Sequence, residues 1–252
     1  MSNSNSALYN KLGLNKYYHP EYSHYVEIGI DEVGRGPLFG RVYSACVILP
    51  KQDECPDFNF DLLKDSKKFT SRKKIKEVAE YIKSNVKFYS IAYEDEKVID
   101  RINIKQASYS AMHKAIKSIT ENKILNQTNE SNQTVTVNEY VLLVDGNDFK
   151  PYTYCHDEGF KHIPHISIVG GDNLYCSIAA ASILAKVEHD KYIDELCEDY
   201  PKLNEYYDLQ KNKGYGTVKH REGIEKYGVS QFHRMCFSTC KSAKINPIDF
   251  YK

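Results

Sequence analysis

The sequence predicts an α/β protein, in which a mixed β-sheet is flanked by helices. Two apolar, β-branched runs open the ordered part of the chain in close succession, at residues 25–31 and 41–49. Further along, similar short runs alternate with segments of helical periodicity. Strands that come first as a pair and later alternate with helices are typical of a mixed sheet. We find no internal repeat and no clear domain boundary.

The first two strands are expected to form a hairpin around a glycine-rich turn. The stretch GIDEVGRGPLFG, residues 29–40, joins them, and Pro50 ends the second strand. A dinucleotide-binding fingerprint needs a helix after its glycines, whereas a strand follows here. No GK[ST] sequence is present, so the turn is not a P-loop either.

The remaining elements follow in order along the chain. A helix capped by Thr70 or Ser71 is expected to run to about residue 84. Further helices are predicted at about 104–119, at 177–196 and, between a Thr217 cap and Gly228, at 217–227. Strands are predicted at 86–93, 140–144 and 166–169. The polar segment 120–138 is expected to be an exposed insertion, and the alanines that open 177–196 allow close packing on a sheet.

Composition limits the functional classes. The chain has 252 residues, 41% hydrophobic and 27% charged, and no apolar run approaches the ~20 residues of a membrane span. Residues 1–24 resemble a flexible polar tail without a signal core, so we expect a cytoplasmic protein with no membrane partner. The seven cysteines include no CxxC pair and are expected to be reduced thiols.

The charge distribution suits a local polyanion groove or ordinary solvated helix faces. The formal net charge is zero, which argues against a general polyanion binder. Basic residues nevertheless gather in two stretches, 64–76 and 211–221. Charge alone does not decide between the two interpretations.

Acidic residues stand where apolar strands end. Asp31 and Glu32 follow the first strand, Asp145 follows the run 140–144, and Asp172 follows the run 166–169. Several ionised carboxylates buried together cost several kcal/mol unless cations neutralise them. Oxygen ligands without Cys or His favour Mg²⁺ or Mn²⁺, and a pair of such ions suits attack on a phosphodiester. The alternative is that each residue is a turn or cap, and spacing alone cannot show that they converge.

Five blocks of sequence, in order, resemble the ribonuclease HII family, in its bacterial form. The blocks are DEVGRGPL at residues 31–38, LKDSKK at 63–68, VDG at 144–146, GD at 171–172 leading into IAAASILAKV at 178–187, and GYGT at 214–217 with His233, Arg234 and Phe237. The resemblance implies a ribonuclease H-like fold with a five-stranded mixed sheet and a helical C-terminal part. It divides the chain into a catalytic domain at 25–200 and a substrate-contacting region at 201–252.

The resemblance also implies an activity and a site. The family cleaves RNA in RNA/DNA hybrids and cuts DNA 5′ to an embedded ribonucleotide, leaving 3′-hydroxyl and 5′-phosphate ends. Carried over by motif, the catalytic and metal-binding residues are Asp31, Glu32, Asp145 and Asp172, which hold two Mg²⁺ or Mn²⁺ ions. Asp190 matches a further acid of the family and is kept as a possible support. A monomer is expected.

Substrate choice is expected to depend on the 2′-hydroxyl, which distinguishes RNA from DNA. In the family, the backbone of the turn that corresponds to Gly34-Arg35-Gly36 contacts this hydroxyl, and glycines without Cβ allow that approach. Tyr215 matches the tyrosine that senses the RNA–DNA junction. Lys67 and Lys68 match phosphate-contacting positions, and Arg35 could reach phosphate or brace the carboxylates.

Several positions depart from the family pattern. Gly170 replaces a common lysine, His189 a common arginine, Arg41 a common proline and Cys236 a common serine, and Phe39 is unusually bulky. Cys155, His156, His162 and His165 suggest either a zinc site or, more simply, a solvated loop. Two other functions remain open: a nuclease of the same fold that acts on DNA only, and a binding module without catalysis.

Overall fold

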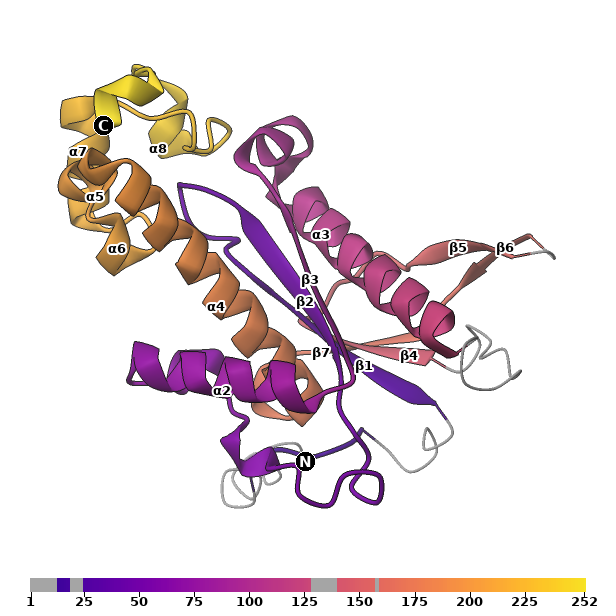
Figure 1. Ribbon diagram of the computed structural model, residues 1–252. Helices are drawn as coiled ribbons and strands as arrows, with labels where there is room; N and C mark the ends of the chain where they lie inside the picture. The colour runs from indigo at the N-terminus through magenta and orange to yellow at the C-terminus, as the bar shows by residue number, and fades with distance from the viewer. Residues whose placement is uncertain (1–12, 19–24, 128–139, 157–158) are drawn as a thin grey trace, which may run out of the picture. The chain divides into compact units, whose positions relative to one another are not determined.

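The computed structural model describes residues 13–18, 25–127, 140–156 and 159–252 (Figure 1). Most of the predicted N-terminal tail, and residues 128–138 of the predicted insertion, therefore lie outside the described residues. No helix in the described ranges is long and apolar enough to cross a membrane.

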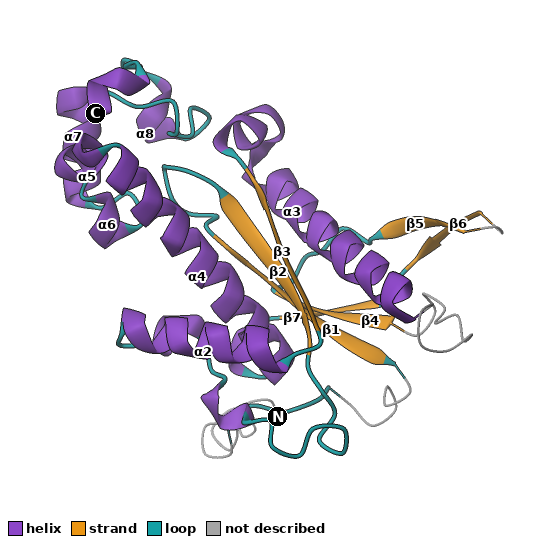
Figure 2. Cartoon of the chain, in the orientation of Figure 1, coloured by secondary structure: helices purple, strands orange, loops and turns teal. Residues whose placement is uncertain are grey.

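A five-stranded sheet forms the centre of the fold, and Figure 2 shows its strands in orange. The strands are β1 (Val26–Val33), β2 (Val42–Ile48), β3 (Phe88–Glu94), β4 (Tyr140–Asp145) and β7 (His165–Ile168), in the order β3-β2-β1-β4-β7. β4 pairs in parallel with β1 and with β7. The predicted α/β class, the five strands and the adjacency of the first two are confirmed.

The chain forms two compact units. Unit 1 takes in the described parts of Met1–Glu32, Ser44–Ala92 and Met112–Ala185. Unit 2 consists of Val33–Tyr43, Tyr93–Ala111 and Lys186–Lys252. The predicted division at residue 200 stays a prediction.

In unit 1, the core forms where strands meet the start of α4 (Cys176–Asp199). Val141 and Leu143 of β4 cluster with Ile178, all at most 1% exposed. A Cβ on Gly29 would lie 2.2 Å from the backbone carbon of Ser177, so the strand and the helix approach closely at a glycine. The alanines of α4 are fully buried, as predicted.

A further helix of unit 1 also follows the sequence. α2 (Arg72–Asn85) begins after Ser71, whose hydroxyl accepts a hydrogen bond from the Lys74 amide. Its buried side chains are Val78, Ala79 and Ile82, which share one helical face.

Unit 2 contains most of the C-terminal helices. These are α5 (Pro201–Tyr207), α6 (Leu209–Asn212), α7 (Val218–Tyr227) and α8 (Ser238–Lys241), followed by a 3₁₀ turn at Ile248–Tyr251. Thr217 caps α7 by accepting from the His220 amide, and Gly228 ends the helix, as predicted. The predicted helical C-terminal part is confirmed.

Two expectations need correction. The helix predicted at 104–119 is longer: α3 (Glu96–Gln127) breaks at Asn103, whose φ is 66°, and continues through 120–127 of the predicted insertion. The Asn103 side chain accepts from the Gln106 amide, which explains why the periodicity began at residue 104. The region expected to be a solvated loop forms an antiparallel pair, β5 (Thr153–His156) with β6 (Gly159–His162).

Candidate active site

The register of the sheet brings predicted carboxylates together in unit 1. Ile30 of β1 lies opposite Val144 of β4, so the next residues along these parallel strands are Asp31 and Asp145. Asp172 lies in the 3₁₀ turn Gly171–Asn173, which follows β7 on the other side of β4. Asp31 and Asp172 are 4% and 2% exposed. Carboxylates from three separate segments therefore lie at one end of these strands, where Asp31 and Asp172 are buried and Asp145 is half-buried.

The charges of this cluster act on one another. The pKa of Asp31 lies well above its ordinary value, chiefly because the side chain is buried, and the charges of Glu32, Asp145 and Asp172 raise it further. The pKa of Asp145 is raised by burial and then by Asp172. Neighbouring charges thus make ionisation of Asp31 and Asp145 harder, and a positive charge at this place would relieve the repulsion.

Backbone amides hold two carboxylates of the cluster in place. The amide of Gly171 donates to Asp145 Oδ1 at 2.7 Å, and the amide of Glu32 donates to Asp31 Oδ1 at 2.7 Å. Gly170, which departs from the family pattern, takes a left-handed conformation with φ 67° and opens the turn that carries Asp172. This position serves the turn geometry, which a lysine would adopt only with strain.

Lys67 brings a positive charge to the cluster. Its Nζ lies 3.3 Å from Asp172 Oδ2, although the side chain is 79% exposed. Burial alone would lower the pKa of Lys67, but Asp172 and Asp65 outweigh it and raise the pKa. Lys68 is exposed beside it. An exposed ammonium compensates one carboxylate only in part.

Sequence reasoning gave no role to the residues that hold Lys67 in place. Asp65 accepts from the Lys67 amide at 2.8 Å and from Asn173 Nδ2 at 3.1 Å, and so links the two turns. The hydroxyls of Ser66 and Ser182 lie 2.9 Å apart. The sequence pointed to these residues in part, because Asp65 and Ser66 lie inside the LKDSKK block at residues 63–68.

The donor set fits a hard divalent cation. The converging groups are carboxylate oxygens, which suit Mg²⁺ or Mn²⁺ rather than a softer metal. Across the described ranges, no three His, Cys, Asp or Glu side chains are already grouped as a coordination shell. The residues thus supply the ligand chemistry that such an ion prefers. The zinc alternative stays open, since the side chain of His156 lies outside the described residues.

Unit 2 contains the glycine-rich turn, in the loop of residues 34–41 that joins β1 to β2. Gly34 has φ +97°, and a Cβ there would lie 2.9 Å from both the Arg41 carbonyl oxygen and His189 Cδ2. Arg35 and Gly36 are exposed, while the residues on either side of them are buried. A Cβ on Gly36 would lie 3.2 Å from the ring of Tyr215, which is 43% exposed. The structure therefore brings the turn and the predicted tyrosine together.

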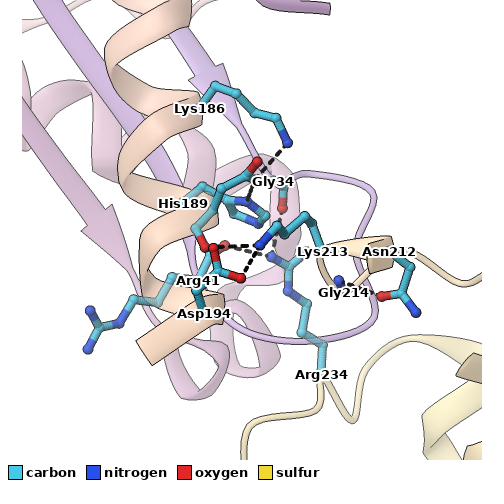
Figure 3. A network of polar contacts seen from close by, with 10 residues as sticks. Gly34, Arg41, Lys186, His189, Asp194, Asn212, Lys213, Gly214 and Arg234 are labelled. Atoms are coloured by element: carbon cyan, nitrogen blue, oxygen red, sulfur yellow. Dashed lines mark hydrogen bonds and ion pairs between the residues drawn. The ribbon is translucent and has the colours of Figure 1, made fainter. Parts of the chain in front are cut away.

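Buried polar contacts fix the segment that carries Tyr215 (Figure 3). Lys213 is 4% exposed and pairs with Asp194 of α4. Asn212 Oδ1 accepts from the Gly214 amide at 2.9 Å, and the Gly214 carbonyl accepts from the Leu38 amide at 2.8 Å. These contacts tie the segment both to α4 and to the 34–41 loop.

The structure gives the departures near this turn a packing role. Phe39 is fully buried and meets the ring of His233 edge-on at 5.0 Å. The guanidinium of Arg41 lies between the rings of Tyr93 and Tyr192, at 3.9 and 4.1 Å. Nothing in the structure explains Cys236 in place of serine.

Asp190 is paired within unit 2. Its carboxylate lies 2.7 Å from Lys186 Nζ and 3.1 Å from Nδ1 of the buried His189. Burial lowers the pKa of His189, so the neutral ring donates from Nδ1 to Asp190. Nε2 of His189 is also buried, and the part of the chain that the structure describes gives it no hydrogen-bond partner. The supporting role predicted for Asp190 stays a prediction.

Comparison with known proteins gives consistent matches. A family model described as ribonuclease HII matches residues 28–240. A ribonuclease HII of Bacteroides thetaiotaomicron is 39% identical over 221 residues, which is 88% of this chain and 94% of that protein. The crystal structure of ribonuclease H2 from Pyrococcus horikoshii OT3 superimposes with a TM-score of 0.62 at 20% identity, over 85% of this chain and 95% of that one. Bst-RNase HIII, crystallised in complex with Mn²⁺, gives a TM-score of 0.59 at 19% identity, over 94% and 72% of the two chains. At these identities the two structures show the shared ribonuclease H-like fold.

Proposed function

Because this chain belongs to the ribonuclease HII family, we propose that it hydrolyses the RNA strand of RNA/DNA hybrids and cuts DNA 5′ to an embedded ribonucleotide. The products would be 3′-hydroxyl and 5′-phosphate ends. Family membership already makes the chain a ribonuclease H, a hydrolase of phosphodiester bonds. The observation that carries the finer proposal is the carboxylate cluster, in which Asp31 is buried and the charges of Glu32, Asp145 and Asp172 raise its pKa, so that a bound cation would stabilise it.

We propose that Asp31, Glu32, Asp145 and Asp172 hold two Mg²⁺ or Mn²⁺ ions. Bound there, such ions would lower the pKa of an attacking water and stabilise the charge on the leaving oxygen. The Mn²⁺ complex of Bst-RNase HIII supports a divalent metal in a protein of the same fold. Asp31 would be the most strongly stabilised by a cation, because the charges of all three other carboxylates raise its pKa.

The residues around the cluster would orient the substrate. Lys67 and Lys68 form an exposed basic pair whose ammonium groups suit the phosphates that flank the cut. Lys67 is held through its amide by Asp65, so its backbone is fixed while its tip is exposed. Arg35 would contact a further phosphate.

Discrimination between RNA and DNA would lie in the exposed turn and in Tyr215. In the sequence only Val33 separates Glu32 from Gly34, so the chain itself links the carboxylates to the turn. The backbone of Gly34, Arg35 and Gly36 would hydrogen-bond the 2′-hydroxyl. Tyr215, whose ring faces Gly36, would stack on the deoxyribose at the junction.

The test is a DNA duplex that contains one ribonucleotide, incubated with the protein and Mg²⁺ or Mn²⁺. We expect a nick 5′ to the ribonucleotide, cleavage of a continuous RNA/DNA hybrid, and no cut in an all-DNA duplex. Asp31→Asn should abolish cutting, whereas the matched control Asp57→Asn, an exposed carboxylate of unit 1, should cut normally. Absence of the nick from the wild-type protein would refute the proposal.

The same assay separates the alternatives. Cleavage of the all-DNA duplex would indicate a DNA nuclease of the same fold, and metal-independent binding without cleavage would indicate a binding module. That the protein acts as a monomer in the cytoplasm stays a prediction, which sedimentation and cell fractionation would check.

A further inference from the structure

We infer that two consecutive residues, His233 and Arg234, position the parts of unit 2 that read the substrate. Arg234 would orient the backbone of the Gly34-Arg35-Gly36 turn, and His233 would act through His220 on the backbone of Tyr215. The inference rests on the proposed function, because it concerns how a 2′-hydroxyl is recognised. Neither residue is proposed to touch the reacting atoms.

The side chain of Arg234 fills the inside of the 34–41 loop. It is fully buried, and all five of its N–H donors face backbone carbonyls of that loop. Nε donates to the Gly40 carbonyl at 2.8 Å. Nη1 donates to the carbonyls of Arg35 at 3.2 Å and Pro37 at 2.8 Å, and Nη2 donates to those of Gly34 at 2.6 Å and Arg41 at 3.0 Å. The Arg234 amide also donates to the Leu38 carbonyl at 2.9 Å.

This arrangement determines where the amide groups of the turn point. In a planar trans peptide the C=O and the following N–H point in opposite directions, and the described residues contain no cis peptide. The carbonyls of Gly34 and Arg35 point at Arg234, so the amides of Arg35 and Gly36 point away from it. These two residues are exposed. Arg234 therefore directs two adjacent N–H donors toward the side from which a hydroxyl oxygen would approach.

The neighbouring residue reaches Tyr215 through a second, buried histidine. The Ser230 amide donates to His233 Nδ1 at 3.0 Å, so neutral His233 carries its proton on Nε2. His233 Nε2 lies 3.2 Å from His220 Nε2, which must then accept. His220 consequently carries its proton on Nδ1 and donates to the Tyr215 carbonyl at 3.0 Å. Burial keeps both rings neutral, since both histidines are at most 1% exposed.

Because the two residues are adjacent, one short piece of chain fixes both reading elements. His233 forms an isolated β-bridge with Phe39, in the same loop that Arg234 fills. The loop and the Tyr215 segment are also joined directly, by the Leu38 amide and the Gly214 carbonyl. The distance between the turn and the tyrosine ring is thus set by buried hydrogen bonds rather than by exposed side chains.

The test measures binding in an Asp31→Asn background, so that no substrate is cut. Discrimination is measured as a ratio of two dissociation constants: the constant for an all-DNA duplex divided by the constant for the same duplex with one ribonucleotide. Arg234→Lys keeps the charge but offers only three donors from one atom, so the five-carbonyl contact is lost. We expect the ratio to fall about tenfold, equivalent to about 1.4 kcal/mol, through weaker binding of the ribonucleotide duplex alone. Arg101→Lys, exposed on α3, is the matched control.

The histidine arm has its own pair of variants. The amide of Asn superimposes on Nδ1 of histidine and that of Gln on Nε2. His220→Asn should therefore keep the contact with the Tyr215 carbonyl, and His220→Gln should lose it. We expect discrimination to fall in His220→Gln and to be retained in His220→Asn.

Hydrogen exchange supplies a measurement independent of substrate. Arg234→Lys should speed amide exchange in residues 34–41, and His220→Gln should speed it around Tyr215, without faster exchange in α2. A folded Arg234→Lys protein with wild-type discrimination would overturn the inference. Should that variant fail to fold, equal discrimination by His220→Gln and His220→Asn would overturn it instead. A wild-type protein that neither cuts nor prefers the ribonucleotide duplex would contradict the proposed function itself.

Discussion

The buried histidine pair predicts a specific loss of stability in mild acid. Burial lowers the pKa of His220 from the ordinary value of 6.5 to about 4, and that of His233 falls well below its usual range. Protonated His220 would direct an N–H at the N–H of His233, and this repulsion opposes uptake of the proton. The perturbation to test is a change from about pH 7 to about pH 5.

The sign follows from which state binds the proton first. A histidine with a lowered pKa in the folded protein is protonated first in the unfolded chain, so acid favours unfolding. The contribution to stability is complete above about pH 6.5 and is lost as the pH falls toward about 4. A pH of about 5 is about 1.5 units below the pKa of the histidine in the unfolded chain. Protonation of His220 in that chain therefore lowers the unfolding free energy by about 2 kcal/mol.

The assay compares urea unfolding of the wild type and of His220→Asn at constant ionic strength. An asparagine side chain does not titrate, so the variant lacks this loss, and the difference in unfolding free energy between the two proteins should shift by about 2 kcal/mol in favour of the variant. Between about pH 7 and 8 the difference should stay constant, because the histidine is neutral in both states. A difference that does not change down to about pH 5 would refute the assigned protonation states.

Three further predictions concern the proposed site. In metal-free buffer, Asp31→Asn should raise the unfolding free energy by about 1–3 kcal/mol, since it removes a buried charge. Added Mg²⁺ should stabilise only the wild type. Urea unfolding measures both effects, and a metal-free variant less stable than the wild type would contradict this prediction. Gly34→Ala should lower the unfolding free energy by about 1–3 kcal/mol, and by more than the control Gly159→Ala. Both glycines have positive φ, but of the two only Gly34 has other atoms close to the position of a Cβ. Equal losses of unfolding free energy in the two variants would contradict this reasoning. Tyr215→Ala should reduce kcat/KM at a single ribonucleotide about tenfold more than on a long hybrid, and equal losses would remove its junction role.

The sheet and the carboxylates were accessible from sequence because each had a local signal. Apolar runs of β-branched residues marked the strands, and Asp145 and Asp172 stood directly behind two of them. The parallel register then follows from topology and brings Asp31 beside Asp145. The antiparallel pair of β5 and β6 lacked such a signal, because both strands are largely exposed and alternate weakly.

The roles of Asp65, Lys213 and Arg234 were not accessible in the same way. A buried arginine or lysine has no periodicity, and its partners are distant in sequence: Arg234 contacts carbonyls about two hundred residues earlier. Composition treats both residues as surface charge. Only the folded chain shows that Arg234 and Lys213 are internal cations and that Asp65 joins two turns of unit 1.

The way Arg234 fills the 34–41 loop has a consequence for loop length. Connections between strands usually tolerate insertions and deletions, because their backbone faces water. Here five carbonyls converge on one guanidinium, and a residue added or removed would change which carbonyls face inward. No other side chain carries five donors in a fixed plane, so substitution at Arg234 could not compensate. The 34–41 loop is therefore constrained in length as strictly as a core strand. Insertions or grafted segments should be placed in another loop.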